Sequence, residues 1–337
     1  MSNPNPAITM TPPPIAPVPP GVERPLWSVM IPTFNCAKYL RQTLESVLAQ
    51  DPGSEHMQIE VIDDCSTKDN PEVVVREVGK GRVAFYRKQK NAGAIANFNT
   101  CIERSRGHLV HILHGDDWVE PGFYENLCEA FEQYAEVGIC ITRAFMVDER
   151  GSIDYLSPRI PQLEEPASQV EFMYYSNPVR TPGVVVRRNL YEIHGGFFLT
   201  LIHTADWEMW IRICRLSRGL FINKPLASYR VFPMNDTGRL ARTGENLRDH
   251  LRFAEIVKSR ESKFNDVLFM NEMLHRARIQ SERFKAIGDL TAFEANWNVY
   301  RAILAKQPLR RKAIEFIHNI RAGLYTSKSR YTSAVKA

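Results

Sequence analysis

Short apolar segments alternate with segments of helical periodicity along roughly the first 140 residues of the chain. The apolar segments are rich in β-prone residues and end in polar or turn-forming residues; they lie at 27–31, 59–63, 83–86 and 108–113. Apolar residues recur at helical spacing in the segments that follow them, at 37–50, 71–79, 94–105 and 121–135. Strands that alternate with helices in this way predict a mostly parallel β-sheet in a three-layer α/β/α domain.

Polar clusters follow three of the predicted strands. PTFN (32–35) follows the first strand, DDCS (63–66) the second and GDD (115–117) the fourth. In sheets of this kind, ligands bind at the carboxyl ends of the strands, which meet at one edge. The sequence therefore predicts a polar crevice at that edge.

Two pairs of adjacent aspartates stand in this crevice. Asp116 and Asp117 repel each other when both are ionised, and their oxygens suit Mg²⁺ or Mn²⁺, ions that also bridge phosphate oxygens. The alternative is that this pair caps the helix that begins near Pro121. In the other pair, Asp63 and Asp64, a carboxylate can accept the imide N–H of a uracil or thymine ring. The alternative there is an Asx turn before the next helix.

Four segments taken together resemble the nucleotide-binding half of a family 2 glycosyltransferase with the GT-A fold. They are, in chain order, IPTFN, VIDDCS, the stretch from Asn91 to Asn99, and LHGDD. The resemblance covers roughly residues 27–235. It implies a GT-A domain over 25–235, a helical C-terminal region over 236–337, and an inverting transferase that uses a nucleotide-sugar donor with Mn²⁺ or Mg²⁺.

The resemblance implies a role for each matching residue around the nucleotide. The acidic residue that reads the base is Asp64, supported by Asp63, which favours a uridine or thymidine donor. Gly93 and Asn97 lie beside the base and the donor sugar, although this chain has Asn97 and Phe98 where many members have an arginine. The first loop packs on the base and ribose with Pro32, Thr33, Phe34 and Asn35.

The remaining donor contacts are implied in the same way. Asp116 touches the ribose or sugar, and Asp117 is the direct metal ligand. Arg230, which follows a predicted short strand, is implied as a contact to the diphosphate; the alternative is an ordinary surface arginine. His114 stands next to the GDD turn, within reach of the diphosphate.

The second half of the predicted domain contains a candidate catalytic base. TADWEMWIRI (204–213) predicts a helix, and Asp206 in its first turn fits both a helix N-cap and an active-site acid. The resemblance favours the second role, because Asp206 matches the family's catalytic base; Ala205 stands where the family motif has a glutamate. Glu208 is a fallback base, but helical geometry turns it about 200° away from Asp206.

These residues predict one inverting displacement. Asp206 deprotonates an acceptor hydroxyl as it attacks the anomeric carbon, and the metal stabilises charge on the leaving nucleoside diphosphate. The expected acceptor is a saccharide or a lipid-linked molecule of the cell envelope, as in polysaccharide biosynthesis. The alternative is a non-catalytic sugar-nucleotide-binding or scaffold protein on the same fold. A nicotinamide dehydrogenase and a nucleotidyltransferase are disfavoured, because the glycine-rich signature of each is missing after the first strand.

The two ends of the chain differ from its body in composition. Residues 1–20 contain eight prolines and neither Lys nor Arg, which predicts a disordered Pro-rich tail over 1–24 and argues against a secretory signal. Residues 301–337 carry nine Lys or Arg and one Glu, so the first 300 residues have a formal charge of −3 within a total of +5. A slightly acidic body argues against nucleic-acid binding.

The basic C-terminal region predicts an amphipathic helix over 309–325. Such a helix either lies on an anionic membrane surface or packs on its own domain. No run of 18 apolar residues predicts a membrane span. Six scattered cysteines without a CxxC pair suit a reducing cytosol. The sequence therefore predicts a cytoplasmic protein that can also bind the inner face of the membrane.

Overall fold

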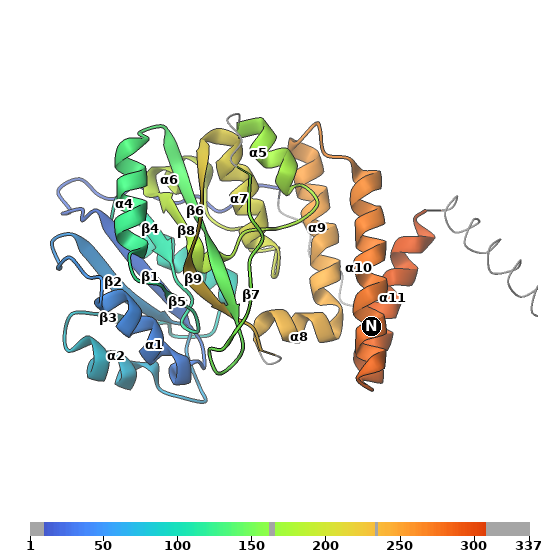
Figure 1. Ribbon diagram of the computed structural model, residues 1–337, viewed down its shortest axis with the longest axis horizontal. Helices are drawn as coiled ribbons and strands as arrows, with labels where there is room; N and C mark the ends of the chain where they lie inside the picture. The colour runs from blue at the N-terminus through green and yellow to red at the C-terminus, as the bar shows by residue number, and fades with distance from the viewer. Residues whose placement is uncertain (1–9, 162–165, 233–234, 308–337) are drawn as a thin grey trace, which may run out of the picture. The chain divides into compact units, whose positions relative to one another are not determined.

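The chain divides into two compact units in the computed structural model, which describes residues 10–161, 166–232 and 235–307 (Figure 1). Unit 1 contains the residues up to Gly238 together with Asp249–Asn265, and unit 2 contains Arg239–Arg248 and the residues from Asp266 on. The sequence predicts a boundary after residue 235. The structure instead returns Asp249–Asn265 to the unit that contains the sheet.

A sheet of nine strands, counted over the described residues, forms the centre of unit 1. The first four strands in the chain are β1 (Trp27–Thr33), β2 (Met57–Asp63), β3 (Ala84–Arg87) and β4 (Leu109–Ile112). They pair in parallel in the order β3-β2-β1-β4, as the alternating pattern predicts. All seven residues of β1 are buried, which requires layers on both faces of the sheet.

The second half of the sheet mixes strand orientations. Its strands are β5 (Trp118–Val119), β6 (Val137–Val147), β7 (Ile153–Leu156), β8 (Val184–Arg187) and β9 (Arg218–Arg230). β8 is antiparallel to both β4 and β6, while β6 and β9 are parallel. β5 and β7 pair antiparallel with β9 and β6. Because β8 reverses direction between β4 and β6, the carboxyl ends of β1, β4, β6 and β9 share one edge.

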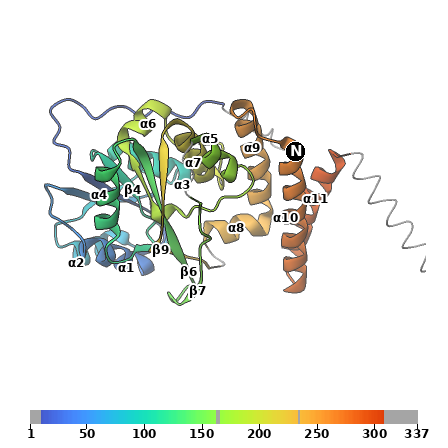
Figure 2. The same ribbon diagram turned by 45° about the horizontal axis from the view of Figure 1, so that its top comes forward.

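Helices cover both faces of the sheet, as Figures 1 and 2 show, and the predicted three-layer fold is confirmed. The helices of the sheet region are α1 (Ala37–Leu48), α2 (Pro71–Gly79), α3 (Ala94–Arg104), α4 (Phe123–Gln133), α5 (Pro166–Met173), α6 (Arg188–His194) and α7 (Ala205–Leu216). α1, α2 and α4 share a core with Val29 and Ile31 of β1. Met30, between these two residues, is buried on the opposite face, because side chains alternate along a strand. α3 contacts β1, β2 and β4, and α7 contacts β6 and β9.

The part of the Pro-rich segment that the structure describes, residues 10–24, packs against the rest of unit 1. Ile15 is buried, and the Pro13 carbonyl accepts a hydrogen bond from Gly196 N at 2.8 Å. The Ala16 carbonyl accepts another from the Arg188 guanidinium at 3.2 Å. These contacts differ from the predicted disorder, because the free carbonyls and the isoleucine find partners that composition does not reveal. Residues 1–9 lie outside the described residues.

Helices dominate the C-terminal region, as its periodicity predicts. They are α8 (Asp236–Thr243), α9 (Glu245–Arg260), α10 (Asp266–Ala286) and α11 (Leu290–Ala305). In unit 2, α10 and α11 pack on each other, and Asp289 caps α11 by accepting a hydrogen bond from Ala292 N at 3.1 Å. The basic amphipathic helix predicted over 309–325 lies outside the described residues. Within the described residues, no helix combines the length and apolarity needed to cross a membrane.

His111 of β4 is fully buried and uncharged in the folded protein. The Pro182 carbonyl can only accept, so Nε2 donates to it at 2.9 Å, and Nδ1 lies 3.1 Å from the Tyr124 hydroxyl. Burial lowers the pKa of His111 to about 3. In the unfolded chain His111 has an ordinary histidine pKa and binds a proton, whereas in the folded protein it stays neutral. The free energy of unfolding therefore falls as the pH drops from about 6.5 towards 3.

Replacing His111 by Gln, which keeps a donor for Pro182 but cannot ionise, should reduce the loss of stability at low pH. The single histidine accounts for about 2 kcal/mol of the stability lost between pH 7.5 and pH 5. Urea unfolding of both proteins at the two pH values measures the difference. Equal losses in the wild type and His111→Gln would contradict a neutral buried histidine.

Candidate active site

The predicted polar clusters meet at the shared carboxyl edge of the sheet. Backbone hydrogen bonds continue past the strand ends, with Gly115 N donating to the Pro32 carbonyl at 3.1 Å and Asp64 N to the Thr33 carbonyl at 2.9 Å. These bonds hold the loops after β1, β2 and β4 side by side. The structure therefore brings the three clusters together, as the rule for parallel sheets predicts.

Asp117 is bound by the surrounding chain and is only 1% exposed. Its Oδ1 accepts a hydrogen bond from Arg230 N at 2.8 Å, and the Thr43 hydroxyl binds its backbone carbonyl at 2.7 Å. Its Oδ2 lies 3.3 Å from His114 Nδ1 and has no other partner among the described residues. A buried carboxylate oxygen with so few donors is suited to a cation.

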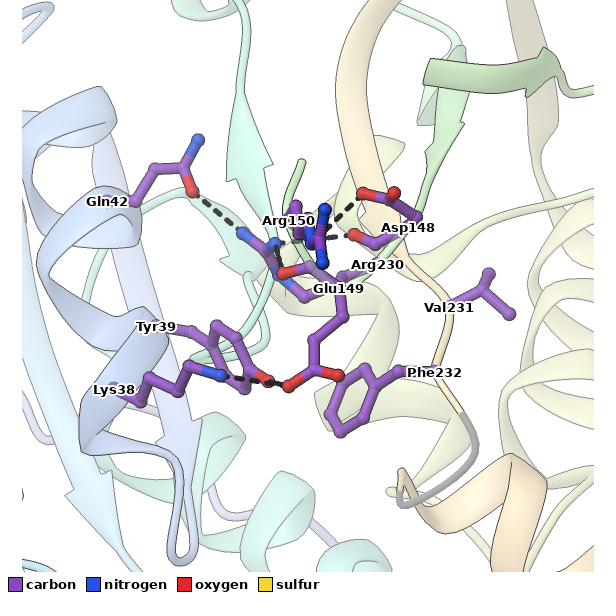
Figure 3. Close-up of a pocket in the computed structure, with 9 residues that line it drawn as sticks. All are labelled: Lys38, Tyr39, Gln42, Asp148, Glu149, Arg150, Arg230, Val231 and Phe232. Atoms are coloured by element: carbon purple, nitrogen blue, oxygen red, sulfur yellow. Dashed lines mark hydrogen bonds and ion pairs between the residues drawn. The ribbon is translucent and has the colours of Figure 1, made fainter. Parts of the chain in front are cut away.

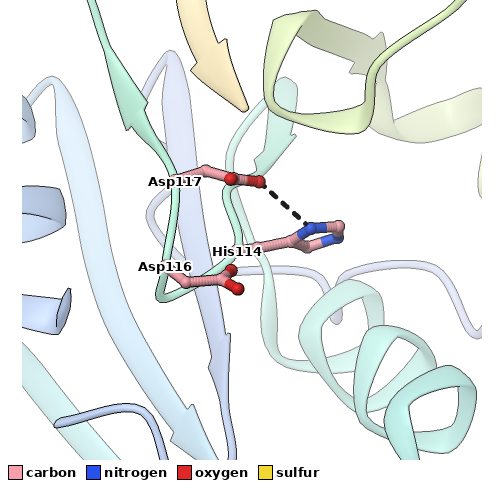
Figure 4. Close-up of side chains that lie close together, drawn as sticks. All are labelled: His114, Asp116 and Asp117. Carbon is pink, nitrogen blue, oxygen red and sulfur yellow. Dashed lines mark ion pairs between the residues drawn. The ribbon is translucent and has the colours of Figure 1, made fainter. Parts of the chain in front are cut away.

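Asp116 and His114 complete an acidic cluster around Asp117 (Figure 4). One ligand atom from each of the three residues lies within 4.8 Å of the others. Burial, and after it the charge of Asp117, raises the pKa of Asp116 to about 7. The His114 ring stacks on Phe98 with centroids 5.1 Å apart, and its buried Nε2 has no partner within the described residues. The cluster thus offers two carboxylates and one imidazole to a cation.

Burial alone would lower the pKa of His114, but the surrounding carboxylates raise it. The hydrogen bond and charge of Asp117 act first, followed by the charges of Asp116 and Asp206. Asp206 therefore lies close enough to the cluster to act on it electrostatically, although it comes from the other half of the domain.

Asp206 occupies the first turn of α7, one residue inside the helix, while Thr204 holds the N-cap position. Its Oδ1 accepts a hydrogen bond from Trp207 N at 2.6 Å, and its Oδ2 accepts one from the Thr181 hydroxyl at 3.2 Å. The N-terminal end of a helix favours an ionised carboxylate. The fallback base Glu208 is buried and paired with Arg212 and is not at the cluster.

The aspartates after β2 are both bound within the protein. Asp63 is fully buried and accepts hydrogen bonds from Arg87 Nε at 2.6 Å and from Ser66. Asp64 is nearly as buried, and its carboxylate accepts from the N–H groups of Ala92 at 3.0 Å and Gly93 at 2.8 Å. Lys88 Nζ lies 3.0 Å from the same carboxylate. Asp64 thus holds the segment before α3 in place, and its role as the base reader stays a prediction.

The first loop presents one side chain to solvent and uses the others internally. Phe34 is 45% exposed. Asn35 has a positive φ of 53°, and its Oδ1 accepts hydrogen bonds from Thr67 N and Lys68 N at 2.8 and 2.9 Å. The Thr33 hydroxyl is hydrogen-bonded to the Cys36 thiol, and the Pro32 carbonyl accepts the hydrogen bond from Gly115 N. Phe34 is thus the loop side chain with a free face for a base.

Gly93 and Asn97 stand at the start of α3. Gly93 has φ +90° at the helix N-cap, and a Cβ there would meet nothing within 4 Å. The Asn97 side chain is buried and donates to the Ile62 carbonyl at 2.9 Å, while its Oδ1 has no partner among the described residues. Asn97 therefore ties α3 to β2, a role that the sequence pattern does not predict.

Arg230 is 3% exposed and is bound by the protein itself. Its guanidinium lies between the rings of Tyr39 and Trp118, 4.7 and 5.0 Å from their centroids. It donates to the Asp116 carbonyl at 2.9 Å and to Gln42 Oε1 at 2.7 Å. In the structure Arg230 anchors the Asp116–Asp117 turn, and its contact to the diphosphate stays a prediction.

A cavity of about 670 Å³ opens on the far side of Arg230 (Figure 3). It lies between the N-terminal half of α1, the turn after β6 and the end of β9. Arg230 links its wall to the acidic cluster through the Asp116 carbonyl. The lining residues are Lys38, Tyr39, Gln42, Asp148, Glu149, Arg150, Arg230, Val231 and Phe232.

Two parts of the site differ from the sequence prediction or are missing from it. The structure adds His114 to the acidic cluster, a role that its position two residues before Asp116 at the same strand end indicates, and its predicted place near the diphosphate stays a prediction. Thr181 is not a predicted site residue, and its bond to Asp206 crosses 25 residues of chain. The TPG turn before β8 marks a special backbone there but not its partner.

Known proteins share the sequence pattern and the fold. Residues 28–191 match the family model described as glycosyl transferase family 2. The chain is 28% identical over 241 residues to the uncharacterized protein MT1568 of Mycobacterium tuberculosis. The aligned region covers 68% of this chain and 74% of that protein. It is 22% identical over 272 residues to chondroitin synthase of Escherichia coli, or 79% of this chain and 35% of the synthase. The crystal structure of S. aureus TarS 1–349 in complex with UDP-GlcNAc has a TM-score of 0.50 at 16% identity, covering 85% of this chain and 92% of that one.

Proposed function

Because residues 28–191 match the glycosyl transferase family 2 model, we propose that the chain is a metal-dependent inverting glycosyltransferase of that family. Its donor is a uridine or thymidine nucleotide-sugar, and its acceptor is a hydroxyl of a saccharide or of a lipid-linked cell-envelope molecule. One observation carries this proposal. The Thr181 hydroxyl binds Asp206 at 3.2 Å, and the carbonyl of the next residue, Pro182, accepts a hydrogen bond at 2.9 Å from His111 of β4, the strand that leads to His114. The candidate base is thereby tied to the strand that carries the candidate metal cluster.

The nucleotide is proposed to bind over the ends of β1 and β2. The exposed ring of Phe34 provides a face on which a base can pack. Asp64 offers an acceptor for the imide N–H of uracil or thymine, which cytosine lacks. A carboxylate has about four lone-pair directions, and the Asp64 carboxylate already has four contacts, with Lys88 and Ala92 at Oδ1 and with Ala92 and Gly93 at Oδ2. Base contact at Asp64 therefore displaces one of these donors.

The residues that would hold a divalent cation are Asp117, Asp116 and His114. They fit one, because Asp117 Oδ2 is buried with His114 as its single neighbour within the described residues, and one ligand atom from each of the three residues lies within 4.8 Å of the others. Such a cation, when bound, stabilises negative charge on the leaving diphosphate. Oxygen ligands suit both Mg²⁺ and Mn²⁺, whereas an imidazole suits transition metals better, so the set favours Mn²⁺.

Asp206 is proposed to take the proton of the acceptor hydroxyl. The acceptor oxygen then forms a bond to the anomeric carbon, while the bond from that carbon to the diphosphate oxygen breaks and its electron pair leaves with the nucleotide. The Thr181 hydroxyl and the Trp207 N–H hold the two oxygens of Asp206 in one orientation. A single displacement of this kind inverts the anomeric configuration.

A thermal-shift panel of UDP, dTDP, GDP and CDP, each with Mn²⁺, Mg²⁺ or EDTA, tests the donor site. A ligand that binds only the folded protein adds about 2.7 kcal/mol of stability at 100 times its dissociation constant. UDP or dTDP with Mn²⁺ should give the largest shift, Mg²⁺ a smaller one, and EDTA little. A larger shift with GDP than with UDP or dTDP would contradict the reading of the base by Asp64.

A further inference from the structure

α7 begins without a capping side chain of its own. The N-terminal turn of a helix leaves backbone N–H groups without intrahelical partners, and a side-chain oxygen at the N-cap normally binds one of them. Thr204 is in the N-cap position but makes no such bond. Its hydroxyl instead donates to Asp249 of α9, 45 residues further along the chain, at 2.9 Å.

The fully buried carboxylate of Asp249 binds the whole segment that leads into α7. Its Oδ2 accepts hydrogen bonds from His203 N and Thr204 N, both at 2.8 Å. Its Oδ1 accepts one from Ile202 N at 3.1 Å and one from the Arg252 guanidinium at 3.2 Å. Three consecutive N–H groups that converge on one anion form a nest, and Asp249 is the anion that fills it.

Aromatic packing joins the same two segments. The Trp207 ring stacks on Phe253 with centroids 4.2 Å apart, and His250 packs against Trp207 at 5.7 Å and against His203 at 5.4 Å. Trp207 directly follows Asp206, and its N–H binds Asp206 Oδ1. The first turn of α7 is therefore fixed on one side by α9 and on the other by Thr181.

From these contacts we propose that Asp249 is a positioning residue for Asp206, resting on the role of Asp206 in the proposed function. α9 lies beyond the domain boundary that the sequence predicts, yet it completes the acceptor half of the active site. Without the Asp249 carboxylate, three N–H groups lose their acceptor in a buried place, and the backbone two residues before Asp206 moves to recover partners. The donor half, built on β1, β2 and β4, contributes none of these hydrogen bonds to Asp249 and stays as it is.

Asp249→Asn tests this proposal, because it keeps the size of the side chain but offers one acceptor oxygen and an amide that faces N–H donors. We expect kcat to fall about 10- to 100-fold, as small misplacements of catalytic groups do, with the donor KM and the nucleotide-induced thermal shift within about threefold of wild type. The matched control is Asp289→Asn, which removes the capping carboxylate of α11 in unit 2 and should leave kcat unchanged.

Hydrogen exchange of the amides of residues 202–204 gives a readout that does not depend on transferase activity. These amides should exchange slowly in the wild type and at least tenfold faster in Asp249→Asn. If the wild type transfers no sugar, the proposed function fails. The exchange experiment still tests whether Asp249 holds the segment before α7. A folded Asp249→Asn protein with wild-type kcat and protected amides would overturn the proposal. If that variant does not fold, Thr204→Val removes one of the bonds, and an unchanged kcat in it would overturn the proposal equally.

Discussion

Asp206→Asn should lower the turnover number for sugar transfer by about 10²- to 10⁴-fold, the usual contribution of a general base. The amide keeps an oxygen for the Thr181 hydroxyl or the Trp207 N–H, so the first turn of α7 should stay in place. It cannot take a proton from the acceptor. Donor binding should be unchanged, because the nucleotide is bound by other elements. Initial-rate kinetics together with the nucleotide thermal shift measure both effects.

The matched control for Asp206→Asn is Asp266→Asn. Asp266 also stands in the first turn of its helix, α10, so this variant removes the same favourable charge at a helix N-terminus. It should lose a fraction of a kcal/mol in stability and none of the activity. If Asp206→Asn keeps more than a third of wild-type kcat, another group is the base. The proposal that Asp249 positions the base through Asp206 then also fails.

The parallel half of the fold follows from local signals. Each of the first four strands is a short apolar run that ends at a turn, and each intervening helix has its own apolar stripe, as with the buried Leu40, Leu44 and Val47 of α1. The spacing of apolar residues indicates which face of each strand or helix is buried, one element at a time. The carboxyl-edge rule then places Asp64, Asp116 and Asp117 together without knowledge of a single contact.

The rest of the site depends on contacts between distant segments. TPGVVVRR predicts a strand, but nothing in it states that β8 runs antiparallel between β4 and β6. The sequence also predicts a basic residue near the diphosphate at position 230. The partners that bury Arg230 come from α1 and from the loop after β4, and no local pattern reports them. For the same reason, periodicity assigns Asp249 to a helix but not to the helix that carries Asp206.

Asp117→Asn should abolish the metal-dependent part of nucleotide binding and lower transfer by about 10²-fold or more, a typical loss for one group that stabilises transition-state charge. Asp117 Oδ2 is the buried oxygen whose single neighbour among the described residues is His114, and the amide puts a weaker ligand there. The Mn²⁺-dependent thermal shift with UDP or dTDP should disappear. The shift that remains in EDTA should match that of the wild type.

The same substitution should not weaken the metal-free fold, and this separates a metal ligand from a structural carboxylate. Burial and the charge of Asp117 both raise the pKa of Asp116, so in the wild type the charge of Asp117 opposes the ionisation of Asp116. In the variant, the oxygen of the new amide can still accept the hydrogen bond from Arg230 N, and the repulsion is gone. In EDTA, Asp117→Asn should therefore unfold at the same temperature as the wild type or higher, the usual trade between stability and function at an active site.

The Asp116→Asn variant separates the two effects of Asp117→Asn, which are the loss of a metal ligand and the relief of repulsion between the two carboxylates. It neutralises the neighbouring carboxylate, so it should also maintain or raise the unfolding temperature in EDTA. It leaves Asp117 and His114 in place, and the Mn²⁺-dependent shift should be reduced but present. If both variants lose the shift equally, the two aspartates hold the cation together. If Asp117→Asn retains a full shift, or loses several kcal/mol of metal-free stability, Asp117 is a structural residue and the cation binds elsewhere.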